Sequence, residues 1–234
     1  GKILDTLFAE WERVQFISRR LEGPEWDERY QKAVAARGER LCRAAHELEH
    51  KRLTFSQAGC ISARIEGDTF LVSATRSQLG KLTPDELSLV IRADERTGEI
   101  FWCGPKMPSS ETPLHIVAYR NRPSVGAIVH THCPDITYGP RTKPWRTTGY
   151  IRSGRFSFGQ SLLEQMTGAR RNFIIAKDHG EVAVGADLDE AMRVLADAYA
   201  YAAGAPSGFL TTSARDHADG DVQVSGACHA SGRV

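Results

Sequence analysis

Two histidines stand one residue apart in the stretch IVHTHCPD, at residues 128–135. The apolar residues before them indicate a buried strand, and side chains two apart on a strand point to the same side. His130 and His132 would therefore face one site together, as imidazole ligands of a divalent metal such as zinc do. A single pair of this spacing also arises by chance in a chain with eight histidines, so the prediction depends on what else converges on it.

Two further residues are of the right chemical type. His179, in AKDHGEV, lies at the end of another predicted strand, and Glu111 lies in the first turn of the helix predicted before the His130 strand. Three protein ligands and one open position are typical of a catalytic zinc centre. Glu111 could ligate the metal or move a proton beside it. His115, four residues further on, could simply pair with Glu111 on the same helix face.

The composition excludes several classes of protein. Apolar residues make up 41% and charged residues 25% of the 234 residues, which is typical of a soluble globular domain. A net charge of +1 argues against nucleic acid or an anionic membrane as a partner. No apolar run is long enough to span a bilayer, and no secretory segment opens the chain. The five cysteines are scattered without a C-x-x-C pair, which favours a reducing cytoplasm over a disulfide framework.

The first half of the chain predicts helices followed by strands. Helical spacing of apolar residues covers 3–20 and 25–52. Alternation around a Gly-Asp turn then predicts a hairpin over 60–74, and two more strands are joined across 95–98.

The second half begins with a helix over 108–123, which Ser109 or Ser110 can cap. The His130 strand and an irregular loop over 134–153 follow. The remaining elements are a helix over 157–169, strands within 171–180 and 181–186, and a helix over 187–203. Because strands and helices interleave without regular βαβ spacing, we expect an α/β fold with a mixed sheet covered by helices.

The chain divides into three predicted parts. Residues 1–34 form a helical extension, residues 35–204 form the domain that carries the candidate site, and residues 205–234 form an irregular tail. The tail is rich in Gly, Ser, Asp and His and has no periodicity.

Three segments in order, SSETPLH, YRNRPSVGAIVHTHC and IIAKDHGEVAVG, resemble the class II aldolase/adducin family over roughly residues 35–203. The resemblance implies a largely antiparallel sheet with helices on both faces. It implies that His130, His132 and His179 hold one divalent metal ion. Zinc is the first expectation for this metal, and Fe(II) is the alternative. The resemblance also implies that Glu111 is the catalytic acid/base. It also implies a homotetramer with its sites at subunit interfaces.

The family's phosphate-binding pattern is only half kept. Sugar-phosphate aldolases of the family use a Gly-Asn-x-Ser turn, a Thr-Pro-x-Gly-like loop and a Ser-Ser pair. Here Cys60 replaces the asparagine of the turn that ends at Ser62, and Arg76 replaces the glycine of the loop. Ser109 and Ser110 remain, at a helix start that favours anions. We expect these residues to bind the substrate's anionic group, with the Arg76 fork suited to a carboxylate or a differently placed phosphate.

The family's aldolases lend a tyrosine side chain to the site of a neighbouring subunit, and Tyr138 and Tyr150 are candidates for that tyrosine.

Three functions remain open. The first is a metal-dependent carbon–carbon lyase acting on a small hydroxy-carbonyl or keto-acid substrate, favoured by the kept Ser-Ser-Glu. The second resembles the non-haem iron oxygenase/decarboxylases of aminocoumarin biosynthesis, favoured by the broken phosphate loops. The third is an adducin-like scaffold without catalysis, which would have no need for a complete metal set. The sequence favours the lyase.

Overall fold

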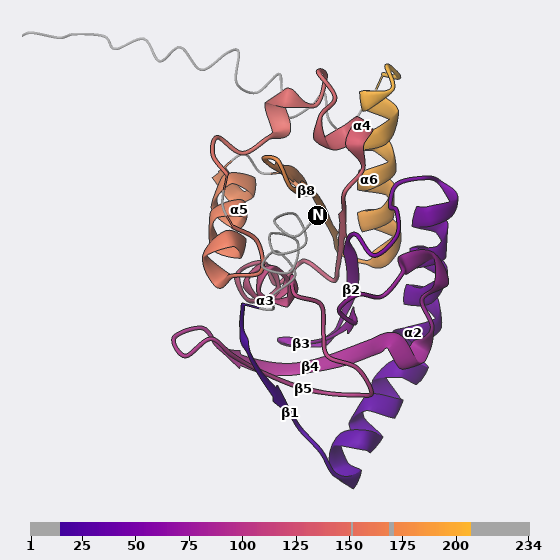
Figure 1. Cartoon of the computed structure of the whole chain (residues 1–234), viewed down its shortest axis with the longest axis vertical. Helices are drawn as coiled ribbons and strands as arrows, with labels where there is room; N and C mark the ends of the chain where they lie inside the picture. Colours follow the sequence, from indigo (N-terminus) through magenta and orange to yellow (C-terminus); the bar gives the residue numbers. More distant parts are fainter. Residues whose placement is uncertain (1–14, 151, 169–170, 207–234) are drawn as a thin grey trace, which may run out of the picture.

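The computed structural model describes residues 15–150, 152–168 and 171–206 (Figure 1). At its centre is an eight-stranded sheet in the order β1-β5-β4-β3-β2-β6-β8-β7. Neighbouring strands pair antiparallel everywhere except between β1 and β5. The mixed, largely antiparallel α/β sheet expected above is confirmed.

The strands are β1 Ile17–Arg20, β2 Cys60–Glu66, β3 Thr69–Ser73, β4 Leu87–Asp94, β5 Glu99–Cys103, β6 Ala127–Thr131, β7 Phe173–Ala176 and β8 Gly180–Gly185. The α-helices are α2 Pro24–His50, α3 Thr112–Asn121, α4 Pro134–Thr137, α5 Phe156–Gly168 and α6 Leu188–Ala202. Short 3-10 turns cover Leu79–Lys81, Pro84–Glu86 and Lys143–Trp145.

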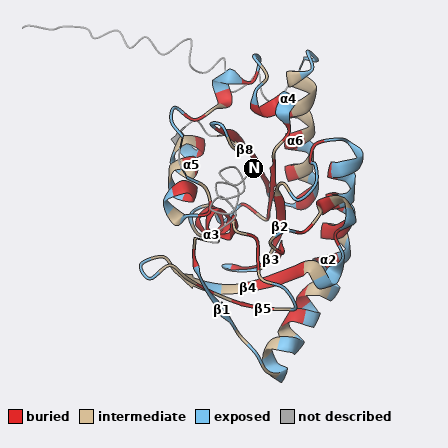
Figure 2. Ribbon diagram, viewed as in Figure 1, coloured by how far each residue is buried: buried red, intermediate tan, exposed pale blue. Residues whose placement is uncertain are grey.

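Helices cover both faces of the sheet, with α2 and α6 on one side and α3 and α5 on the other (Figure 1). One apolar cluster joins Leu41 of α2 and Leu195 of α6 to Val129 of β6. A second joins Phe158 of α5 to Ile128 of β6. Consecutive residues of β6 therefore point into opposite cores, and β3 and β6 are buried along their whole length (Figure 2). His130, in phase with Ile128, faces the α3/α5 side.

Most predicted elements are confirmed. The hairpin expected over 60–74 is β2 and β3, turning at Gly67 with φ 48°. The helix expected over 25–52 is α2, one continuous helix that also contains the predicted domain start at residue 35. The last predicted helix is α6, where the Asp187 side chain accepts a hydrogen bond from the Glu190 backbone N–H at 2.9 Å. The expected irregular loop also contains the short helix α4 and a 3-10 turn.

The helix expected over 3–20 is wrong at its end, because Ile17–Arg20 form β1. This edge strand completes the backbone hydrogen bonds of β5, pairing Ser18 with Ile100 in parallel register. Trp102 donates a side-chain hydrogen bond to Ser18 at 2.8 Å, which ties the strand down further. Tertiary pairing outweighs local helical spacing here. Residues 1–14 and the predicted tail from 207 onward lie outside the described residues.

Among the described residues, no helix is long and apolar enough to cross a membrane.

Candidate metal centre

Three histidines converge at one end of the β6–β8 pair. His130 is on β6, His132 follows the last residue of that strand, and His179 lies in the turn that leads into β8. One ring nitrogen from each lies within 4.8 Å of the others. The Nε2 atoms of His130 and His132 are 2.9 Å apart, and the His130 and His179 rings stack with centroids 5.1 Å apart. The structure thus brings together the three ligands predicted from sequence.

The orientation of His130 is fixed by the backbone. Its Nδ1 lies 2.9 Å from the carbonyl oxygen of Glu181, so Nδ1 carries the proton and donates it there. The Nε2 lone pair is left facing the other two rings. A ring nitrogen tied to a carbonyl while the other faces inward is the usual arrangement of a histidine that ligates a metal.

Two glycines allow the backbone to approach the histidines closely. A Cβ at Gly180 would lie 2.4 Å from the carbonyl oxygen of Thr131 and 2.9 Å from Cδ2 of His132. A Cβ at Gly59, where φ is +93°, would lie 2.4 Å from the carbonyl oxygen of His130. Any other residue at either position would push the site apart. Neither glycine is among the site residues predicted from sequence, although Gly180 stands in the His-Gly pair.

Glu111 completes the cluster from the other layer. It is the residue before α3, and its Oε1 lies 3.7 Å from Nε2 of His179, too far for a hydrogen bond. The Glu111 Oε2 and the His179 Nε2 are buried, and neither has a hydrogen-bond partner among the described residues. Each unsatisfied buried polar atom costs about 1–3 kcal/mol. A cation between them would remove that cost, so the residues present fit a metal.

The protonation states also fit a metal. Burial lowers the pKa of His132 to about 4 and, together with the neighbouring His132, the pKa of His179 to about 3. Burial first, then the other two histidines, lowers the pKa of His130 well below its usual value. All three imidazoles are therefore neutral near pH 7, the form that binds metals.

The carboxyl group beside them titrates in a different range. Burial raises the pKa of Glu111 to about 7, against the lowering effect of hydrogen bonds from Ser153 and Gly154. A carboxyl group with a pKa near the working pH can both accept and donate a proton.

His115 does not have the partner suggested by its position in the sequence. Instead of pairing with Glu111, its Nδ1 lies 2.7 Å from the Ser62 hydroxyl and its Nε2 lies 3.1 Å from the Cys60 thiol. Ser62 continues the chain of hydrogen bonds to the Tyr119 hydroxyl at 2.7 Å. Burial lowers the pKa of His115 to about 3. Both of its ring nitrogens are satisfied without a metal.

The five predicted anion-binding residues fall into two groups. Cys60 and Ser62 are fully buried behind the site, with Cys60 opposite His130 in the β2–β6 pairing. Burial raises the pKa of the Cys60 thiol, which therefore stays protonated. Their side chains bond to His115, so contact with a substrate anion stays a prediction for both.

The second group lies on two adjoining segments. Ser109 donates its backbone N–H to the Ser73 carbonyl at 3.1 Å, and its hydroxyl accepts from the Glu111 N–H at 3.2 Å. The prediction that Ser109 or Ser110 caps this helix is wrong, because Glu111 is the residue at the cap position and no side chain caps α3. Ser109 bonds instead to the residue before the helix, and Ser110 is half-buried beside it. Arg76 is exposed and has φ 61°, the left-handed conformation that favours the glycine expected there. A bulky residue held in that conformation is typical of functional sites, and anion binding by this group stays a prediction.

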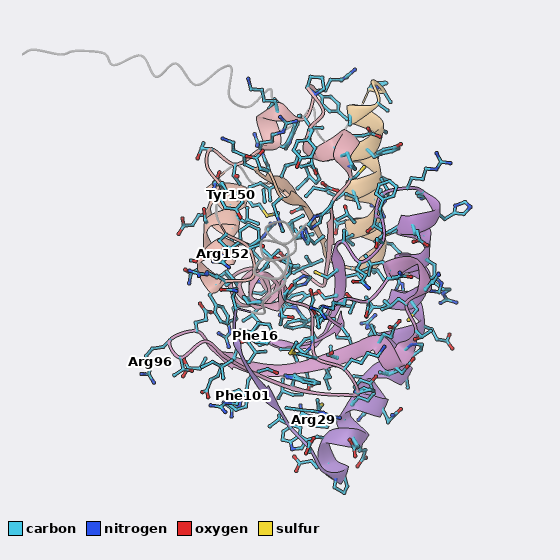
Figure 3. The ribbon with its side chains drawn as sticks, in the orientation of Figure 1. Phe16, Arg29, Arg96, Phe101, Tyr150 and Arg152 are labelled. Atoms are coloured by element: carbon cyan, nitrogen blue, oxygen red, sulfur yellow. The ribbon has the colours of Figure 1, made fainter. Side chains whose placement is uncertain are left out.

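The two candidate tyrosines are both on the surface, Tyr138 with 61% and Tyr150 with 49% of its area exposed. Tyr150 lies at the outside of the molecule in the segment that leads into α5 (Figure 3).

The sequence that forms this site matches a known protein family. Residues 39–203 match the family described as Class II Aldolase and Adducin N-terminal domain. The chain belongs to this family. The match includes all three histidines and Glu111, and its start lies inside α2.

Curated relatives of known activity cover most of the same region. A 5-methylthioribulose-1-phosphate/5-deoxyribulose-1-phosphate aldolase from Rhodospirillum rubrum is 30% identical over 168 residues, 66% of this chain and 73% of that protein. An L-fuculose phosphate aldolase from Methanocaldococcus jannaschii is 28% identical over 165 residues, 65% of this chain and 84% of that protein. A 3-oxo-tetronate 4-phosphate decarboxylase from Haemophilus influenzae is 27% identical over 177 residues, 67% of this chain and 80% of that protein.

Solved structures agree on the fold. A sugar-phosphate aldolase from Thermotoga maritima superposes with a TM-score of 0.59 at 19% identity, covering 70% of this chain and 90% of that one. An L-fuculose 1-phosphate aldolase gives 0.59 at 18% identity, covering 77% and 87%.

Proposed function

We propose that this chain is a metal-dependent carbon–carbon lyase of the aldolase type, with His130, His132 and His179 holding one divalent metal, zinc first. The observation that carries the proposal is the convergence of three neutral imidazoles on a buried Glu111 whose Oε2 has no hydrogen-bond partner among the described residues. The aldolases and the decarboxylase among the relatives support a lyase, because their reactions break carbon–carbon bonds.

The chemistry follows from the positions of the groups. The three histidines would hold the metal, which would supply Lewis-acid polarisation of a substrate carbonyl during cleavage of a carbon–carbon bond. Glu111, with its pKa near 7, protonates or deprotonates the carbon next to that carbonyl. Phe158 of α5 packs edge-on against the His179 ring at 5.5 Å and forms an apolar side of the site. Exclusion of water on that side strengthens the electrostatic interactions of the site.

The proposed substrate is a small hydroxy-carbonyl or keto-acid compound with an anionic group. Ser109, Ser110 and Arg76 are the residues proposed to bind that group, as a carboxylate or a phosphate. Cys60 and Ser62 would support this binding from the buried layer beneath. The names of the aldolase relatives refer to phosphorylated ketoses, whereas this chain lacks the family's asparagine and loop glycine.

The proposal includes a homotetramer in which Tyr138 or Tyr150 reaches a neighbouring subunit's site, as the family pattern implies. We also propose that the protein is located in a reducing cytoplasm, since all four cysteines within the described part of the chain are free and buried. The domain division at residues 34 and 204 remains a proposal of the same kind.

The two alternatives have less support. The relatives named above are aldolases and a decarboxylase, and none is an oxygenase, so only the altered phosphate loops at Cys60 and Arg76 favour Fe(II) chemistry. A non-catalytic scaffold gives no reason for buried polar atoms without partners at Glu111 and His179.

Elemental analysis of protein purified without added metal and without air tests the metal. Zinc, manganese or cobalt near one per chain supports the lyase and leads to cleavage assays with aldehyde-forming and ketose-phosphate substrates. Iron near one per chain, with oxygen uptake on aromatic keto acids, would overturn it in favour of the oxygenase. Protein that takes up no divalent metal would overturn both.

The substitution Glu111→Gln tests the acid/base. We expect kcat to fall by about 10²- to 10⁴-fold, the usual size of a general acid–base contribution, while metal content stays near wild type. Glu164→Gln, at an exposed position of α5, is the matched control and should leave kcat unchanged. Equal kcat values for the two variants would remove Glu111 from the mechanism.

A further inference from the structure

We propose that Glu181 is a positioning residue of the metal centre, whose buried carboxylate holds in place the segment that carries His132. Glu181 is 0% exposed and lies on β8, two residues after His179. This role rests on the proposed metal site, and Glu181 is not among the site residues predicted from sequence.

The carboxylate of Glu181 gathers three donors from the chain around His132. Its Oε1 accepts from the Thr131 hydroxyl and, at 2.8 Å, from the backbone N–H of Cys133. Its Oε2 accepts from the Thr137 hydroxyl at 2.7 Å. The residues immediately before and after His132 are therefore both bound to one side chain.

Glu181 acts from the face of the sheet opposite the metal. Thr131 pairs with Glu181 across β6 and β8, and His130 pairs with Val182. Side chains of directly opposed residues share a face, so Thr131 and Glu181 point toward the α6 side while His130 points toward α3 and α5. The central threonine of the H-T-H motif is thus the attachment point, and the two histidines project from the other side.

Such an attachment is needed because β6 ends at Thr131. His132 lies beyond the last residue of the strand, where the sheet's regular hydrogen bonds no longer hold the backbone. A carboxylate in a protein core costs several kcal/mol unless it is well hydrogen-bonded, so an apolar residue would serve simple packing better. Glu181 also fixes His130, through the carbonyl that accepts from Nδ1. Both functions of Glu181 converge on the geometry of the ligands.

Zinc affinity, measured by competition with a chromophoric chelator, tests the proposal. Thr131→Val keeps the shape of the side chain and removes one donor, and Glu181→Ala removes the whole attachment. Supporting contacts behind metal ligands typically contribute 10- to 100-fold in affinity, so we expect about 10-fold weaker binding for the first and about 100-fold for the second. Glu181→Gln keeps an oxygen for Thr131 and Cys133 and should restore affinity to within a few-fold of wild type.

Thr142→Val is the matched control. Thr142 is also 0% exposed and lies in the segment that follows α4, but its hydroxyl donates to the carbonyls of Ile136 and Gly139 at 2.6 and 2.9 Å. Zinc affinity should be unchanged in this variant. Equal affinities for Thr131→Val and Thr142→Val would overturn the positioning role, whether both are normal or both are weakened.

A second readout on metal-free protein separates this proposal from the proposed function. The backbone amides of His132 and Cys133 should exchange hydrogen faster in Thr131→Val than in Thr142→Val. If wild type takes up no divalent metal, the proposed function fails, yet faster exchange would still support the attachment. Equal exchange rates in the two variants would overturn the attachment even if zinc binds.

Discussion

Two sites in this molecule contain buried or half-buried histidines, and the two sites differ in one respect. The first is the cluster of His130, His132 and His179, and the second is His115 with its hydrogen-bonded neighbours. Burial lowers the pKa in both, to about 3 at His179 and to about 3 at His115. Exposure and pKa therefore do not separate a metal ligand from a structural histidine.

What separates them is where the ring nitrogens point. Both nitrogens of His115 have protein partners, the Ser62 hydroxyl and the Cys60 thiol. In the cluster, Nε2 of His130 faces Nε2 of His132, and Nε2 of His179 has no hydrogen-bond partner among the described residues. A buried ring nitrogen without a donor, next to a Glu111 Oε2 that also lacks a partner among the described residues, is an arrangement that a bound cation would satisfy. Ring nitrogens without a hydrogen-bond partner, more than burial, therefore identify the metal site.

The largest expected effect is the loss of metal in His132→Ala. Removing a ligand should weaken zinc binding by more than about 100-fold, since even contacts behind the ligands contribute 10- to 100-fold. Competition titration and the rise in Tm on adding zinc both measure this effect. His115→Ala is the contrast, with wild-type affinity expected in its folded form. Weakened zinc binding in His115→Ala to the level of His132→Ala would erase the distinction between the groups.

A smaller effect should appear in the stability of His115→Ala. The substitution empties a fully buried volume and leaves the Cys60 thiol without its partner, so the free energy of unfolding should fall by about 3 kcal/mol. Denaturant unfolding of the metal-free protein measures the change. His115→Gln offers replacement donors and acceptors and should recover part of it. A stability equal to wild type in His115→Ala would show that the network has no structural role.

The smallest effect is one that the two groups should share. Their histidines have pKa values below 6.5 in the folded protein, so the unfolded chain binds protons first as the pH falls from 6.5 to about 4. Each such histidine lowers stability by up to about 1.4 kcal/mol per pH unit across that window. The carboxyl groups of Glu111 and Glu181, with pKa values raised by burial to about 7, act in the opposite direction and offset part of this loss.

In the metal-free protein, His115→Gln and His132→Gln should each reduce the slope of the unfolding free energy against pH between pH 6.5 and 5. The reduction should correspond to about one fewer proton taken up on unfolding. Urea unfolding at a series of pH values measures both slopes. A reduced slope in only one variant would mean that the two groups differ in protonation as well as in geometry.

The three histidines of the cluster could be predicted from sequence because the signal around each of them is local. The H-T-H pair, the His-Gly turn and the Ser-Ser-Glu helix start are each visible within a few residues, and their order points to the family. The partner of His115 could not be found in this way, since Glu111 is four residues away in sequence while Ser62 is brought in by a different strand. The end of the first predicted helix was wrong for the same reason, because β5 supplies the hydrogen bonds that make Ile17–Arg20 a strand.

The sequence by itself determined the alternation and helical spacing that build a mixed sheet, the family, and which residue types could hold a metal. Only the tertiary structure decided which histidine nitrogens are left unsatisfied, that Cys60 and Ser62 lie behind the site, and that Glu181 holds the chain around His132. The physical reason is that periodicity records which side of an element faces the core. Hydrogen-bond satisfaction, in contrast, depends on atoms that the fold brings together from distant parts of the chain.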